Sequence, residues 1–110
     1  MESQSPAAQL KKLEKYIYNL KAARHLNTLS TAPREAMIAL RNDVSNARIQ
    51  VDAYQNNEDS RMQAELLARA VELLEQVRAG ILMASSYDLV DVVDVAQLSA
   101  MTELIIERIR

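Results

Sequence analysis

The feature that most constrains this chain is a regular apolar seam in its second quarter. Alternating steps of three and four residues separate Met37, Leu40, Val44, Ala47, Val51 and Tyr54. This alternation is the repeat with which one α-helix presents a single stripe to a neighbouring helix. The seam therefore predicts a helix over residues 34–55, and it requires that at least one other helix lies against it.

The composition favours an all-α chain. Only one glycine and two prolines occur in 110 residues, and because both residue types punctuate strands and turns, their scarcity argues against β-rich folds. Cysteine is absent, which excludes disulfides, thiolate metal sites and cysteine nucleophiles. The only aromatic residues of these types are four tyrosines, since tryptophan and phenylalanine are absent. Few side chains are therefore available to stack on nucleic-acid bases.

Three more helical segments flank the seam. The first is expected over residues 7–29, and Leu10, Leu13, Ile17 and Leu20 form its stripe. The third is expected over 59–79, with an apolar face wide enough to meet two neighbours. The fourth should begin near residue 86 or 88 and run to the end. Short connections favour antiparallel neighbours, so we predict one domain over residues 1–110, an up-down-up-down four-helix bundle with a flexible segment at 1–6.

Gly80 allows two interpretations. The favoured one ends the third helix at residue 79, with Gly80 in the left-handed conformation that follows many helices. In the alternative, the helix continues through residues 81–85, and Gly80 lets a neighbouring helix approach closely. Both interpretations fit the sequence around this position.

The stretch Tyr-Asp-Leu-Val-Asp-Val-Val-Asp-Val at 87–95 places Asp88, Asp91 and Asp94 three residues apart. A strand is disfavoured because aspartate is depleted there and the period is three. In a helix, the dipole favours the first two aspartates near the start, and no ligand is needed to explain them. Asp94 is expected beyond the reach of that effect.

Helical phase makes the last segment apolar on two sides. Leu98 and Ile105 fall on one face, and Val92 and Val93 fall on nearly the opposite face. The helix could break near residues 94–97, or the aspartates could point inward to an arginine or a metal. We favour a third interpretation, in which another chain covers the second side and makes the protein dimeric through its C-terminal helix. The expected contact residues are Val90, Val93, Leu104 and Ile106.

Charge narrows the function further. Residues 1–50 hold eight Lys/Arg against four Asp/Glu, and residues 51–110 hold five against eleven. Basic and acidic helices packed in one bundle explain this division, and the acidic half opposes nucleic-acid binding. No stretch has the length and apolar character of a signal peptide or a membrane span, so we expect a cytoplasmic protein with no membrane partner.

Arg34, Arg41 and Arg48 lie seven residues apart beside the seam. We expect this row to pair with charges on a neighbouring helix, and a row that binds anions is the alternative. His25 is the only histidine, and a position near a helix C-terminus explains it.

Two acidic pairs carry the one enzymatic hypothesis. Glu72 and Glu75, then Asp88 and Asp91, have the three-residue spacing that lets carboxylates share a helix face and hold Mg²⁺ with substrate phosphates. The spacing resembles the ExxE…ExxD motif of all-α nucleotide pyrophosphohydrolases of the MazG type. That resemblance covers 20 residues, departs at Asp88 where glutamate is expected, and implies a magnesium-dependent nucleotide hydrolase. Helical phase turns Glu72 away from the apolar face, so such a site would need a second chain.

The sequence therefore favours a non-enzymatic protein–protein interaction module: an adaptor, a secretion or assembly chaperone, or a small regulatory subunit. The expected partner is another protein or a second copy of the chain. We expect no cofactor, no nucleic acid and no small-molecule substrate.

Overall fold

A computed structural model describes residues 5–110, and every regular element in that range is helical. The elements are α1 (Pro6–Tyr18), α2 (Lys21–Arg24), a 3-10 turn η1 (Leu26–Thr28), α3 (Thr31–Gln55), α4 (Ser60–Ser86) and α5 (Val92–Ile109). The all-α class predicted from the sequence is confirmed for these residues.

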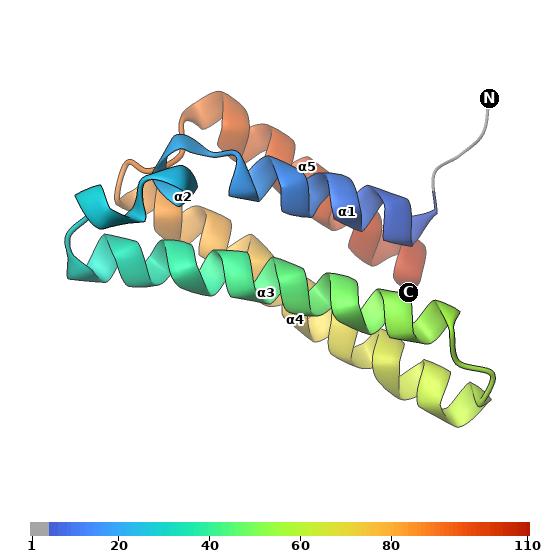
Figure 1. The fold of residues 1–110 in the computed structure, drawn as a ribbon. Helices are drawn as coiled ribbons and strands as arrows, with labels where there is room; N and C mark the ends of the chain where they lie inside the picture. Colours follow the sequence, from blue (N-terminus) through green and yellow to red (C-terminus); the bar gives the residue numbers. More distant parts are fainter. Residues whose placement is uncertain (1–4) are drawn as a thin grey trace.

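Four main helices pack around one core (Figure 1). Helix α3 contacts both α1 and α4, and α5 contacts both α4 and α1, so the four close into a ring. The connection between α3 and α4 lies at the same end as the C-terminus, whereas α2 and the connection between α4 and α5 lie at the other end (Figure 1). Helix α4 meets two neighbours, as its wide apolar face predicts.

The core follows the predicted stripes. In the seam of α3, every residue except Tyr54 is buried, and Tyr54 is half-buried near the C-terminal end of the helix. The stripe of α1 is buried as well, including Leu20 just beyond its end. The largest fully buried side chains from all four helices are Leu10, Leu13, Ile17, Met37, Leu40, Leu74, Ile81, Leu98 and Ile105.

The first segment is shorter than predicted. Ser5 caps α1 by accepting a hydrogen bond from the Ala8 N–H at 3.2 Å, but the helix ends at Tyr18 instead of reaching residue 29. Leu20 then takes an extended backbone conformation while its side chain stays buried. The break lets the buried Ala22 and Ala23 of α2 turn onto the core, which one straight helix could not do. Of the predicted flexible segment 1–6, residues 1–4 lie outside the described residues.

The favoured interpretation of Gly80 is wrong, because α4 continues to Ser86. Gly80 has a negative φ and sits against α3. A β-carbon built at Gly80 would lie 3.1 Å from Leu40 Cδ1, closer than ordinary contact. Gly80 therefore serves close packing between α3 and α4, which is the alternative that the sequence left open.

Two other helix boundaries also differ from the prediction. Helix α4 begins at Ser60, one residue later than predicted, because Asp59 is the capping residue and accepts hydrogen bonds from the N–H groups of Arg61 and Met62. The last helix begins only at Val92, later than residue 86 or 88, and it runs unbroken through residues 94–97.

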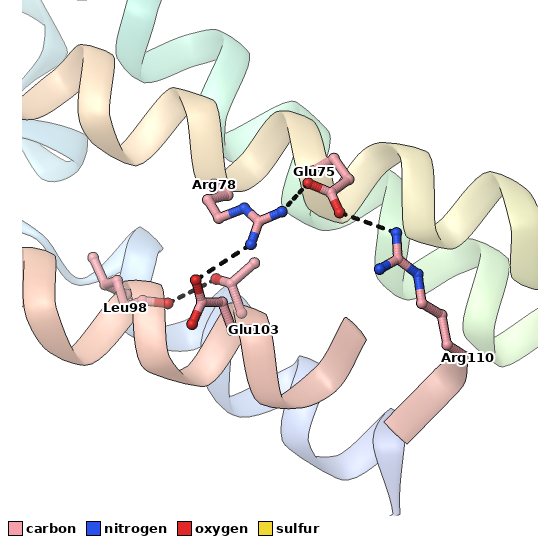
Figure 2. A network of polar contacts seen from close by, with 6 residues as sticks. Glu75, Arg78, Leu98, Glu103 and Arg110 are labelled. Carbon is pink, nitrogen blue, oxygen red and sulfur yellow. Dashed lines mark hydrogen bonds and ion pairs between the residues drawn. The ribbon is translucent and has the colours of Figure 1, made fainter. Parts of the chain in front are cut away.

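Polar contacts fasten α5 to α4 (Figure 2). Arg78 pairs with Glu75 on its own helix and reaches Glu103 on α5 at 3.3 Å, while Arg110 reaches Glu75 at the same distance. Within α5 itself, the buried Thr102 hydroxyl donates to the Leu98 carbonyl one turn earlier at 2.7 Å. The earlier residue of α4, Glu75, pairs with the later partner, Arg110, and Arg78 pairs with the earlier Glu103, as in antiparallel helices. These pairs fix the register of the two helices.

Candidate functional site

The turn that ends α4 is built on an aspartate. Asp88 has a φ of 60°, the only positive φ among the described residues that are not glycine. Its N–H donates to the Ser85 carbonyl at 2.9 Å, and the next N–H, from Leu89, donates to the Ala84 carbonyl at 3.0 Å. These two bonds form a Schellman motif, in which a left-handed residue satisfies the last carbonyls of a helix. Aspartate tolerates that conformation better than most side chains do.

The second aspartate starts the next helix. Asp91 is the capping residue of α5, and its carboxylate accepts a hydrogen bond from the Asp94 N–H at 2.9 Å. A capping side chain of this kind satisfies a backbone donor that the helix leaves free. Asp88 and Asp91 are therefore explained by local structure, although Asp88 lies in the turn and not in the first helical turn.

The third aspartate joins two helices. Asp94 lies in the first turn of α5, contrary to the expected position deeper in the helix. Its carboxylate accepts a short hydrogen bond from the Tyr16 hydroxyl of α1, whose oxygen also lies 2.6 Å from the Gln97 side chain. The bond to Asp94, helped by burial and by the negative charge, raises the pKa of Tyr16 to about 12. Asp94 thus has a partner within the chain.

An exposed apolar surface adjoins these aspartates. Five large apolar side chains are 40–84% exposed within a stretch of 12 residues. We call this surface the corner patch, and it consists of Leu82, Met83, Tyr87, Val92 and Val93. The register set by Arg78 and Glu103 places Leu82 one turn further along α4, level with the second turn of α5.

The patch continues along the outer side of α5. Val93, Ala96, Ala100 and Leu104 recur every three or four residues, and all are exposed. The opposite side of this helix holds the buried Leu98 and Ile105. The helix therefore carries apolar residues on two sides, and one of these sides is open in the single chain.

The four predicted contact residues do not share one surface. Val93 and Leu104 are 65% and 47% exposed, but Val90 and Ile106 are only 6% and 3% exposed and belong to the core. Val90 precedes α5 and is drawn inward by the turn at Asp88, and Ile106 faces the bundle. In this chain only Val93 and Leu104 remain open to another molecule.

Sequence reasoning missed the α4 half of the patch. Leu82, Met83 and Tyr87 fall in a connection if the helix stops at Gly80. If the helix continues, Ile81 and Ala84 share the phase of Val77, and residues 82, 83 and 87 fall outside. The pattern that identifies the patch was present in the sequence, but it depended on the correct helix end.

The residues of the arginine row do not share one environment. Arg48 pairs with Glu14 of α1 at 2.8 Å and with Asp52 at 3.0 Å, as predicted for a row that pairs with a neighbouring helix. Arg41 lies over the Tyr18 ring, with its guanidinium carbon 4.6 Å from the ring centre. No ion pair reaches Arg34 or Arg41 within residues 5–110.

The two acidic pairs of the enzymatic hypothesis lie apart. Glu75 points toward Arg78 and Arg110 (Figure 2), and Glu72 is exposed. At about 1.5 Å per residue, the end of α4 lies roughly 16 Å along the helix from Glu75, and Asp88 and Asp91 follow that end. In the part of the chain that the structure describes, no three His, Cys, Asp or Glu side chains gather where they could hold a metal ion.

Two further findings concern the described helices and the comparisons with known proteins. Within residues 5–110, no helix combines the length and the apolar character needed to cross a membrane. Comparison with protein-family models, curated proteins and solved structures finds no match for this chain.

Proposed function

We propose that this protein is a non-enzymatic protein–protein interaction module that binds through the corner patch and the outer side of α5. The observation that carries the proposal is that five large apolar side chains are exposed within the 12 residues that end α4 and begin α5. Soluble chains rarely leave a contiguous apolar surface open unless another molecule covers it. An adaptor, an assembly chaperone or a small regulatory subunit fits this description.

The magnitude of burial sets the expected affinity. Covering the exposed parts of five such side chains contributes on the order of 5 kcal/mol. Association costs roughly 4–15 kcal/mol in lost motion, so the patch needs Leu104 and the surrounding charges as well. The net binding energy should therefore be small, and we expect a dissociation constant of roughly tens to hundreds of micromolar instead of nanomolar.

The charges around the patch favour a basic counterpart. Asp88 and Asp91 are exposed at its edge, so a partner should bring apolar side chains flanked by lysine or arginine. A second copy of the chain offers such charges: Lys12, Lys15 and Lys21 are exposed on α1 and α2, and no ion pair within residues 5–110 involves a lysine. Lys21 borders one hollow together with Asp88 and Asp91 of its own chain, so the basic surface lies beside the acidic corner in each copy. A two-fold dimer can place each acidic corner against the basic surface of the other copy.

The proposal therefore includes self-association through the C-terminal helix, within an up-down-up-down bundle. The ends of the helices in Figure 1 agree with that order. The cytoplasmic location expected from the sequence stays a prediction.

Sedimentation velocity from about 5 µM to about 500 µM tests self-association, since this range spans a micromolar dissociation constant. We expect the wild-type chain to shift from monomer to dimer. Leu82→Glu and Val93→Glu should each keep the chain monomeric at the highest concentration. Ile49→Glu is the matched control, because Ile49 is 49% exposed on α3, outside the patch, and it should dimerise normally.

Two outcomes would contradict the proposal, one for self-association and one for the surface involved. A wild-type chain that stays monomeric throughout would refute self-association. A chain whose dimer resists both patch substitutions but yields to Ile49→Glu would refute the assignment of the surface.

A further inference from the structure

Two equivalent arginines on α3 have opposite surroundings. Arg48 and Arg41 lie seven residues apart and both face α1, where Glu14 meets the first and Tyr18 meets the second. Arg48 is neutralised by two carboxylates. Arg41 is half-buried, its Nε–H is buried without an acceptor, and it has no ion-pair partner within residues 5–110.

Arg41 also borders a hollow of about 580 Å³ between the end of α1, the α2–η1 segment and the start of α3. Eight residues line the hollow, and no carboxylate is among them: Tyr18, Ala23, Arg24, His25, Leu26, Asn27, Thr28 and Arg41. Arg24 contributes a second guanidinium, which likewise forms no ion pair among the described residues. The lining therefore carries an excess of positive charge.

The walls of the hollow are fixed by hydrogen bonds that leave the cations free. The Tyr18 hydroxyl lies 2.6 Å from Ser45 Oγ, which holds the ring under Arg41. The His25 Nδ1–H donates to the Lys21 carbonyl at 2.9 Å, which leaves Nε2 for another partner. The Thr28 hydroxyl donates to the His25 carbonyl at 2.6 Å and anchors the turn.

We infer that this hollow binds an oxyanion of the phosphate type, held by Arg41 and Arg24, with His25 at its rim. A guanidinium that is partly removed from water without a carboxylate is unfavourable unless an anion reaches it. Arginine is suited to that anion, because its planar fork donates two parallel hydrogen bonds to phosphate or carboxylate oxygens. This inference is independent of the corner patch, which lies on other residues.

The lining of the hollow favours a phosphate monoester over the free ion. Ala23, Leu26 and the Tyr18 ring offer apolar surface beside the cations. A phosphorylated small molecule could place its phosphate at Arg41 and its organic part along that surface.

Titration of the ¹⁵N-labelled chain, followed by NMR at constant ionic strength, tests the inference. The probes are inorganic phosphate and phenyl phosphate. We expect saturable shifts at the backbone of His25 and Thr28 and at the Arg41 Nε–H. Phenyl phosphate should bind more tightly if the organic part contacts the apolar lining, and equal affinities would indicate the free ion as the ligand.

Variants decide whether the arginines are responsible. Arg41→Gln and Arg24→Gln should each weaken phosphate binding about tenfold or more, as expected for the loss of charge-assisted hydrogen bonds. Arg41→Lys keeps the charge without the fork, so its affinity should fall between those of the wild type and Arg41→Gln. Arg69→Gln is the matched control, because it removes the same charge from an exposed position on α4, away from the hollow. This variant should bind phosphate like the wild type.

Circular dichroism of each variant separates lost binding from lost folding, and the exposed Arg24 provides the test if Arg41→Gln unfolds the chain. The inference is overturned if neither probe shifts these signals saturably. It is also overturned if Arg24→Gln binds both probes as tightly as Arg69→Gln does.

Discussion

The turn at Asp88 gives the sharpest test of how the chain ends α4. Asp88 holds a left-handed conformation at φ 60°, and two backbone hydrogen bonds depend on it. Asp88→Gly removes the β-carbon that makes this conformation unfavourable. Asp88→Ala keeps the β-carbon but removes the carboxylate that can bond to the nearby backbone, and Asp88→Asn keeps the shape while removing the charge.

The expected magnitudes follow from the backbone. A left-handed residue costs an L-amino acid about 1–2 kcal/mol, and somewhat less for aspartate or asparagine. Glycine recovers that cost but loses about 0.4–1 kcal/mol through the greater freedom of its unfolded chain. We therefore expect Asp88→Gly to raise the free energy of unfolding by roughly 0.5 kcal/mol, Asp88→Asn to leave it nearly unchanged, and Asp88→Ala to lower it by about 0.5–1 kcal/mol.

Urea denaturation followed by circular dichroism at 222 nm measures these differences. With a slope typical of small domains, about 1–3 kcal/mol per molar urea, the midpoint should move by a few tenths molar between Asp88→Gly and wild type. The protein must be dilute enough to be monomeric, because dimerisation adds to apparent stability. If Asp88→Ala proves as stable as Asp88→Gly, backbone strain at this residue does not govern the end of α4.

Three other predictions concern single side chains. Gly80→Val should lower the free energy of unfolding by roughly 1–3 kcal/mol in the same urea assay because it displaces Leu40, whereas Gly80→Ala should change it by less than about 1 kcal/mol, since better helix propensity offsets the 3.1 Å contact. Tyr16 should ionise near pH 12 in an absorbance titration at the tyrosinate band, and Asp94→Asn should lower the pKa of Tyr16 toward the ordinary value of 10.0. Because the pKa of Tyr16 is raised in the folded state, the stability from its bond to Asp94 is complete below pH 10 and is lost as the pH rises from 10 to about 12. Burial raises the pKa of Asp43 above its usual 3.8, so the folded chain binds the proton of this carboxyl group more tightly than the unfolded chain does. The free energy of unfolding therefore falls as the pH rises from 3.8 through the folded pKa. Asp43→Asn should raise the melting temperature at pH 7 but not at pH 3.

The interior of this protein could be predicted from its sequence. The stripes of α1 and α3 repeat at helical spacing, and all their residues except Tyr54 are buried. Periodicity works here because a buried stripe is a property of one helix and needs no knowledge of its neighbours.

The ends of the helices could not be predicted in the same way, because they depend on tertiary contacts. Gly80 looks like a stop by local chemistry, but Leu40 of a different helix requires its small size. Asp88 is a weaker stop signal than glycine, and yet it takes the left-handed position. The error at Gly80 then hid the apolar residues of α4 that complete the corner patch.

The local roles of the three aspartates bear on the interpretation of Val92 and Val93, which lie between Asp91 and Asp94. Asp88, Asp91 and Asp94 are each held by a turn, a cap or a bond to another helix, so they fix the directions of the neighbouring side chains. Val92 and Val93 occupy the first turn of α5, where the dipole would favour acidic residues by about 0.3–1 kcal/mol. Valine is also a weaker helix former than glutamate, and at 84% and 65% exposure these two gain little from burial. The stability of the single chain therefore does not account for valine at either position, which supports the proposal that another molecule contacts this surface.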